Sequence, residues 1–333
     1  MLVTVTDPRF ADHDAGPGHP ERPARLGAVE AGLTAGAGPD ALRSVAPMAV
    51  PASVLARVHS AAHLARFDSL AAVGGGRIDP DTAMSAGSGE AARLAAGAGL
   101  AAAAALERGD GTAAFCAVRP PGHHAERDRA MGFCLLNNVA VLAADLRDRG
   151  QRVLVLDWDA HHGNGTQDIF WTDPEVCFVS LHQAPLYPGT GRLDERGGGP
   201  GQGATVNVPL PAGTTGDVYL AALTEVVEPV VERFRPDWLL ISAGFDAHRD
   251  DPLTGLGLSA GDFGLLARRV VDWVPSGRIV ALLEGGYDLA ALKASTAATA
   301  AGLLGRHLAP EPPTADGPGA EAVAAARAVH GSA

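Results

Sequence analysis

The sequence predicts an α/β domain in which helices cover both faces of a parallel β-sheet. Short apolar runs rich in β-branched residues alternate with amphipathic or alanine-rich stretches along most of the chain. These runs are almost entirely apolar, which is typical of strands buried on both faces rather than strands with one wet face. With 333 residues, of which 47% are hydrophobic and 19% charged, the chain has enough apolar material for one large core.

Seven strands are expected where apolar runs are bounded by turn residues. They are residues 2–6, 115–118, 153–159, 176–182, 205–210, 238–242 and 279–283. Five helices are expected in the intervals, at residues 90–108, 136–149, 217–234, 260–273 and 289–304. We therefore expect one domain over residues 1–309. The Pro/Ala/Gly-rich segment 310–333 is predicted to be a mobile tail that ends in a weak helix.

Charge and composition exclude several classes of protein. The net charge of −12 argues against nucleic-acid binding, which needs a surplus of basic residues. The longest apolar run, residues 94–106, is shorter than the ~20 residues of a membrane span, and no signal peptide is expected. Cys116, Cys134 and Cys177 are odd in number and share no CxxC spacing, so we expect neither a disulfide framework nor a Cys-rich metal site, and a cytoplasmic location. For Cys134, in a glycine-rich loop, a packing role is favoured over a reactive one.

Nearly every polar cluster follows the end of an expected strand. RPPGHH follows residues 115–118, DAHHGNG follows 153–159, SLHQ closes 176–182, AGFDAH follows 238–242, and EGGY follows 279–283. In open α/β sheets, ligands bind beyond the carboxyl ends of the strands. These five loops are therefore predicted to converge on one site.

A metal site is predicted from acidic residues and a histidine at strand ends. Asp157, Asp159 and His161 alternate along VLVLDWDAHH and would share one face of a strand. Buried carboxylates are costly unless they are paired or bind a metal. Asp159 and His161, with Asp246 after the apolar strand WLLISA, form a plausible set of three ligands that leaves positions open for water and substrate. A structural Asp/His network without metal is the alternative.

The remaining polar residues suggest acid–base chemistry. His123 and His124 follow a rigid Pro-Pro-Gly turn, and imidazole titrates near neutral pH. Asp157 and Asn164 are candidates to orient the two imidazoles. Tyr287, after two glycines, suits a hydrogen-bond donor to an oxyanion, although such a tyrosine is more often a core or rim residue. For His123 and His124, the alternative is a location on the surface.

Six segments together resemble the zinc-dependent histone deacetylase family. They are GHPERPARL, RPPGHHAERDRAMGFCLLNNVA, VLDWDAHHGNGTQ, SLHQAPLYPGTG, ISAGFDAHRDDPLTG and LLEGGYDL, in colinear order between about residues 6 and 304. The likeness is to class II-type and bacterial members, including acetylpolyamine amidohydrolases. It implies the arginase–deacetylase fold, a three-layer α/β/α domain with an eight-stranded, mainly parallel sheet.

The resemblance also implies roles for individual residues. A catalytic metal, usually Zn²⁺, would bind Asp159, His161 and Asp246, although Fe²⁺ also suits these ligands. His124 would be the general base and acid, with His123 as its electrostatic partner. The remaining catalytic residues would be Asp157 behind His123, Asn164 where class I-like members have Asp, and Tyr287, which would polarise the substrate carbonyl.

Two further sets of residues follow from the resemblance. A narrow acyl-lysine tunnel would be lined by Gly132, Phe133, Tyr187, Leu253 and Gly285. Structural monovalent cations, K⁺ in this family, would occupy an inner site at Asp157, Asp159, His161, Ser180 and Leu181 and a second site at Phe170, Asp173 and Val176. An Asp157 committed to a cation complicates its interpretation as a simple partner of His123.

The sequence leaves the substrate open. The implied reaction releases acetate and a free amine from an acetylated lysine peptide, an acetylated polyamine or a small acetylated metabolite. The apolar Leu253 argues against a polyamine specialist. Asp79 and Asp81, on the loop before Thr82, could contact a substrate backbone or amine, although solvation of that loop is the favoured interpretation. A non-catalytic acetyl-ligand binding protein is a minor alternative. A two-Mn²⁺ arginase-like enzyme is disfavoured because Gly163 and His248 replace the carboxylates it needs. Oligomeric state stays open.

Overall fold

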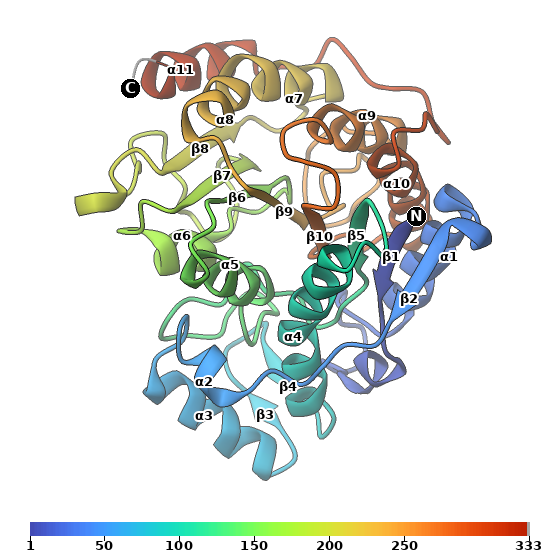
Figure 1. Ribbon diagram of the computed structural model, residues 1–333, viewed down its shortest axis with the longest axis vertical. Coiled ribbons are helices and arrows are strands. Elements are labelled where there is room, and N and C mark those ends of the chain that lie inside the picture. The colour runs from blue at the N-terminus through green and yellow to red at the C-terminus, as the bar shows by residue number, and fades with distance from the viewer. Residues whose placement is uncertain (332–333) are drawn as a thin grey trace.

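The computed structural model describes residues 1–331, in which an eight-stranded parallel sheet lies between two layers of helices (Figure 1). The strand order is β2-β1-β5-β10-β9-β6-β7-β8, and every pairing in it is parallel. The strands are β1 (Leu2–Val5), β2 (Leu42–Val45), β5 (Ala113–Cys116), β6 (Val153–Asp157), β7 (Val176–Gln183), β8 (Thr205–Leu210), β9 (Trp238–Ala243) and β10 (Ile279–Leu283). The predicted α/β/α architecture is confirmed.

Each helical layer is continuous through helix–helix contacts. One layer contains α4 (Ser88–Glu107), α5 (Asn138–Asp148) and α6 (Asn164–Phe170), which contact β1, β5, β6 and β7. The other contains α1 (Ala24–Ala37), α10 (Leu289–Leu303), α9 (Ala260–Val270) and α7 (Gly216–Ala222), with α10 packed between α1 and α9. Within residues 1–331, no helix is both long and apolar enough to cross a bilayer.

Shorter elements lie around this framework. Helices α2 (Ala52–Leu55) and α3 (Ala61–Ala72) pack near α5 and α4, and the hairpin strands β3 (Gly76–Arg77) and β4 (Ala83–Met84) follow them. A π-helical turn (Leu223–Val227) joins α7 to α8 (Glu228–Phe234), and 3-10 turns span Pro8–Asp12, Pro39–Ala41 and Gly199–Gly201. All three cysteines are buried and unpaired, which agrees with the packing role favoured for Cys134.

Several elements were not predicted from the sequence. Strand β2 has no apolar run because it lies at the sheet edge, with two of its four residues exposed. Helix α1 contains three glycines, which lower helix propensity. Its stability comes from packing, because Gly32 and Gly36 lie so close to the α10 backbone that a Cβ atom at either position would clash with it.

The C-terminal segment contains a helix, as expected, but it packs against the domain, whereas a mobile tail was expected before that helix. Glu311 Oε2 lies 2.9 Å from His248 Nε2 and accepts a hydrogen bond from the Ala260 backbone amide. Thr314 donates its hydroxyl to Asp262, and helix α11 (Ala320–His330) packs against β8. These polar contacts are made with residues distant in sequence, so composition alone did not reveal them. Residues 332 and 333 of the predicted tail lie outside the described chain.

Candidate active site and metal centre

The loops that follow β5, β6, β7, β9 and β10 meet at the carboxyl edge of the sheet, as predicted. Because the strands are parallel and adjacent, their ends bring RPPGHH, DAHHGNG and EGGY together in space. Strand β6 ends at Asp157, two residues earlier than expected. Asp159 and His161 therefore lie in the loop, and they do not continue a column of strand side chains with Asp157.

Asp159, His161 and Asp246 form a compact buried cluster of donor atoms. His161 Nδ1 lies 3.2 Å from Asp159 Oδ1 and 2.9 Å from Asp246 Oδ2, and one donor atom from each residue lies within 4.8 Å of the others. The Gly285 amide donates to the other oxygen of Asp159, and the Ala160 amide donates to Asp246 Oδ1. Backbone hydrogen bonds thus fix both carboxylates. Asp159 Oδ1, which also accepts from the His161 amide at 2.9 Å, and Asp246 Oδ2 face the His161 ring.

The electrostatics of this cluster favour a cation. Burial raises the pKa of Asp246 to about 7, and the charge of Asp159 adds to the effect. Although burial opposes charging, Asp159 and Asp246 raise the pKa of His161 to about 10. Positive charge is therefore stabilised at the position shared by the three donors, and two Asp and one His fit a catalytic divalent metal with open coordination positions.

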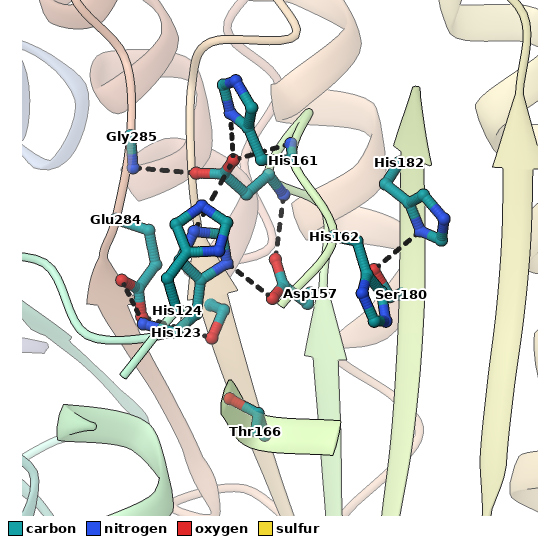
Figure 2. Close-up of polar contacts among 12 residues, drawn as sticks. His123, His124, Asp157, His161, His162, Thr166, Ser180, His182, Glu284 and Gly285 are labelled. Atoms are coloured by element: carbon teal, nitrogen blue, oxygen red, sulfur yellow. Dashed lines mark hydrogen bonds and ion pairs between the residues drawn. The ribbon is translucent and has the colours of Figure 1, made fainter. Parts of the chain in front are cut away.

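His123 and His124 have opposite electrostatic environments, and Figure 2 shows His123 in contact with Asp157. His123 Nδ1 lies 2.9 Å from Asp157 Oδ2, and despite its burial, Asp159 and Asp157 raise the pKa of His123 well above the usual value. His124 Nδ1 lies 2.7 Å from Asn164 Oδ1; burial, together with the charges of His123 and His161, holds the pKa of His124 well below the usual value. The two rings, 4.0 Å apart, are thus poised as one charged and one neutral imidazole.

A cavity of about 230 Å³ opens onto these groups. Its lining residues are Asp81, His124, Gly132, Phe133, His161, Leu186, Tyr187, Leu253 and Tyr287. Four of the five predicted tunnel residues belong to this set. Gly285 does not, because it lies behind the carboxylates: its amide serves Asp159, and a Cβ atom there would clash with Asp246.

The aromatic walls of the cavity are held by contacts that the sequence did not reveal. Phe133 packs edge-on against Tyr287 with ring centroids 5.8 Å apart, and its amide donates to the hydroxyl of Thr82 at 3.1 Å. Asp251 accepts from the amides of Tyr287 and Leu253, at 2.8 and 2.9 Å. Asp251 follows DAHRD directly, so its place in that polar cluster was the available signal.

The position of Asp81 agrees with the alternative of substrate contact rather than with the favoured loop solvation. Asp81 lines the cavity, whereas Asp79 accepts from the amides of Asp81 and Thr82 and so shapes the loop. Burial, followed by a hydrogen bond with Asp79, raises the pKa of Asp81. Asp81 therefore belongs to the candidate substrate site, whereas Asp79 hydrogen-bonds the backbone of its own loop.

The residues assigned to monovalent cations lie on neighbouring elements. Asp157 is directly opposite Ser180 in the β6–β7 pairing, and the Ser180 hydroxyl oxygen lies 2.9 Å from His182 Nδ1. The Leu181 carbonyl accepts from Tyr219 at 3.4 Å. In the second set, the Phe170 carbonyl accepts from the Asp173 amide, and Val176 begins β7. Both cation sites stay proposals.

Comparison with known proteins places this geometry in a family. The model of the histone deacetylase domain matches residues 19–303. A probable deacetylase of Archaeoglobus fulgidus is 41% identical over 289 residues, which cover 84% of this chain and 79% of that protein. A histone deacetylase-like amidohydrolase of Pseudomonas aeruginosa is 41% identical over 240 residues, which cover 70% and 63%.

The fold agrees with the same relationship. A crystal structure of the HDA15 HD domain matches with a TM-score of 0.90 and 37% identity, covering 99% of this chain and 94% of that chain. The eight-stranded parallel sheet with helices on both faces is the arginase–deacetylase fold. The chain therefore belongs to the histone deacetylase family.

Proposed function

We propose that the protein is a zinc-dependent deacetylase that hydrolyses the N-acetyl or related acyl amide of a linear amine. The observation that carries the proposal is the cavity itself. Its lining brings together His161 of the donor cluster, the neutral imidazole of His124 and Tyr287. A substrate amide placed there would meet a metal, a base and a hydroxyl donor together, which is the set of groups that amide hydrolysis needs.

A divalent metal held by Asp159, His161 and Asp246 would polarise the acyl carbonyl and lower the pKa of a water molecule. Zn²⁺ fits this donor set, and Fe²⁺ is tolerated by the same ligands. The buried carboxylates and their backbone hydrogen bonds keep the donors in place. We assign proton transfer and stabilisation of the developing charge to other side chains of the protein.

His124 is the proton carrier in this scheme. Its Nδ1–H donates to Asn164 Oδ1, so its Nε2 carries the free lone pair. The lowered pKa keeps that nitrogen unprotonated at neutral pH. Nε2 can take a proton from the attacking water and deliver it to the departing amine, which balances the reaction to acetate and a free amine.

His123 and Tyr287 stabilise the charge that develops. With its raised pKa, His123 stays positively charged beside Asp157 and supports the tetrahedral anion electrostatically. Burial raises the pKa of Tyr287 well above its usual value, so its hydroxyl stays protonated and can donate to the oxyanion. Phe133 and Tyr187 would flank the apolar stem of the substrate.

Two classes of amine are candidates for the substrate. An acyl-lysine side chain in a peptide fits the apolar rim, where Tyr187 and Leu253 are 39% and 37% exposed. An acetylated polyamine is the second candidate, because the carboxylate of Asp81 lines the same cavity and would attract an ammonium group. We favour the acyl-lysine because apolar residues outnumber acidic residues in the lining of the cavity.

Steady-state kinetics on one zinc-loaded preparation would test the proposal. Acetyl-lysine peptides, acetyl-polyamines and longer acyl-lysine peptides should be compared by kcat/KM, with release of acetate or the longer acid measured directly. We expect the highest kcat/KM with an acyl-lysine peptide. Preference for acetyl-polyamines would select the second candidate, and no turnover of any substrate would favour a non-catalytic acetyl-ligand binding protein.

A further inference from the structure

A buried carboxylate at the end of β10 has no part in the scheme above. Glu284 is completely buried, one residue before the glycine whose amide supports Asp159. Its Oε2 accepts hydrogen bonds from the backbone amides of Gly122 at 2.6 Å and His123 at 3.1 Å, and its Oε1 accepts from the Ser242 hydroxyl at 3.3 Å. Figure 2 shows the carboxylate beside the backbone at His123.

This contact lies where the histidine loop lacks regular structure. Residues 119–126 form neither helix nor strand, and within the described chain no other acceptor is recorded for the amides of Gly122 and His123. Buried amides without an acceptor are rare because leaving them unpaired is unfavourable. The space is also closed on the other side, since a Cβ atom on Gly122 would lie 2.5 Å from the Asn138 amide nitrogen.

We propose that Glu284 is a positioning residue for the proposed deacylation, and that its carboxylate fixes the backbone from which both imidazoles project. The inference rests on the proposed function only for its kinetic consequence. The amides of the neighbouring residues Gly122 and His123 both donate to one carboxylate oxygen of Glu284, which directly follows β10.

The same loop is held from the opposite side by α6. The His123 carbonyl accepts from the amides of Gly165 at 3.0 Å and Thr166 at 3.2 Å. Glu284 therefore binds the amides of this segment, and the start of α6 binds the carbonyl of His123. With both in place, His123 reaches Asp157 and His124 reaches Asn164 at hydrogen-bond distance.

The position of Glu284 also links the histidines to the metal donors. The Arg25 guanidinium donates to the Glu284 carbonyl at 2.5 Å and to the Gly286 carbonyl at 2.7 Å, which immobilises the segment. The Glu284 side chain then sets the histidine loop, while the next amide along the chain sets Asp159. A short stretch of backbone thus fixes the distance between the proton carrier and the metal ligands.

Two substitutions separate the reach of this side chain from its charge. Glu284→Gln keeps the length: its amide oxygen can accept from both backbone amides, and its NH₂ can donate to the Ser242 hydroxyl. Glu284→Asp keeps the charge but is one methylene shorter, so the oxygen no longer reaches the loop. As a control, Asp262→Ala removes another buried carboxylate that accepts backbone amides, at the start of α9 and outside the cavity lining.

If positioning is the role, the glutamine variant should retain kcat within about threefold. The aspartate variant should lose kcat about 100-fold, the effect expected of a small misplacement of catalytic groups, with KM changed less than threefold. Asp262→Ala should lower Tm while leaving kcat and KM within about twofold. Metal content per chain should be matched between preparations.

Hydrogen exchange provides a measurement independent of activity. Amides of Gly122 and His123 should be as protected in Glu284→Gln as in the unmodified protein, and should exchange at least tenfold faster in Glu284→Asp. If the aspartate variant does not fold, the glutamine variant still decides, because a tenfold loss of kcat or of protection there overturns the proposal. The proposal is also overturned if Glu284→Asp keeps its activity while Glu284→Gln loses it, or if both variants lose activity equally.

The experiment separates this inference from the proposed function. If the unmodified protein hydrolyses no acyl amide, the proposed function fails, yet the exchange rates at Gly122 and His123 still test the role of Glu284. If the unmodified protein is active and Glu284→Asp is equally active and equally protected, only the positioning role is lost.

Discussion

Asn164→Asp would test the assignment of His124 as the proton carrier. Asn164 Oδ1 lies 2.7 Å from His124 Nδ1, and Asn164 Nδ2 donates to Glu126 at 2.7 Å, which fixes the orientation of the amide. The substitution keeps an oxygen beside Nδ1 and adds a negative charge there. That charge stabilises protonated His124, so the pKa of His124 rises.

The size of the shift follows from the short distance. Two unit charges about 4 Å apart interact by about 4 kcal/mol at an effective dielectric constant of about 20, which corresponds to about 3 pKa units. Repulsion between the new carboxylate and Glu126 reduces this gain. We therefore expect the pKa of His124 to rise by about 1 to 3 units.

The consequence is visible in the pH dependence of kcat/KM. Because the pKa of His124 is lowered in the protein, the unprotonated base persists at acidic pH and the acid limb lies below the usual histidine range. Raising that pKa moves the acid limb to higher pH. Gln167→Glu, further along α6 where the side chain bonds His162, serves as control and should move the limb much less.

Acetyl-lysine peptide kinetics between about pH 5 and 9 would measure both limbs. An acid limb that stays in place, or moves to lower pH, in Asn164→Asp would refute the assignment. An equal shift in the Gln167→Glu control would show that any added charge nearby has the same effect.

Three further predictions use other groups. Tyr287→Phe should lower kcat by about 10² to 10³ with little change in KM, because only the oxyanion donor is removed; unchanged turnover in steady-state assays would exclude that role. Asp246→Asn should lower bound zinc from about one to below about 0.1 per chain by elemental analysis, and full occupancy would contradict its place in the donor set. Burial holds the pKa of His59 at about 3, and its Nε2 accepts from the Asn137 amide, so stability falls as pH drops below the unfolded value near 6.5. Between pH 7.5 and 5 the unmodified protein should therefore lose about 2 kcal/mol more unfolding free energy than His59→Gln does, as measured by urea denaturation at both pH values. An equal loss of unfolding free energy in the two proteins would contradict this prediction.

The parts of the fold that were predictable are those whose signals are local. Buried parallel strands such as β9 and β10 are continuous apolar runs, so their existence could be read directly. Strand β2 and helix α1 could not, because an exposed edge and a glycine-containing helix carry weak local signals. The packing of α1 on α10 stabilises it, and that contact joins residues more than 250 positions apart.

Some residues of the candidate site could likewise be predicted from the sequence, and others could not. Asp159, His161 and Asp246 were predictable because parallel topology forces the ends of adjacent strands together, whatever the details of the loops. Glu284 and Asp251 act through backbone amides of distant residues, and an amide donor leaves no mark in the sequence. Their roles therefore became visible only when the loops were in place.

The geometry around position 163 favours the proposed centre with a single metal over one with two metals. A second ion would need a bridging carboxylate two residues beyond His161, and Gly163 occupies that position. A Cβ atom on Gly163 would overlap Asp157 Oδ2 and approach Phe178 at 3.1 Å, so a longer side chain cannot be accommodated there without displacing Asp157. His248, at the other expected bridging position, turns its Nε2 away to Glu311 at 2.9 Å. The same Asp157 oxygen that excludes a side chain at 163 lies 2.9 Å from His123, so the room a second metal ligand would need is used to hold His123 charged.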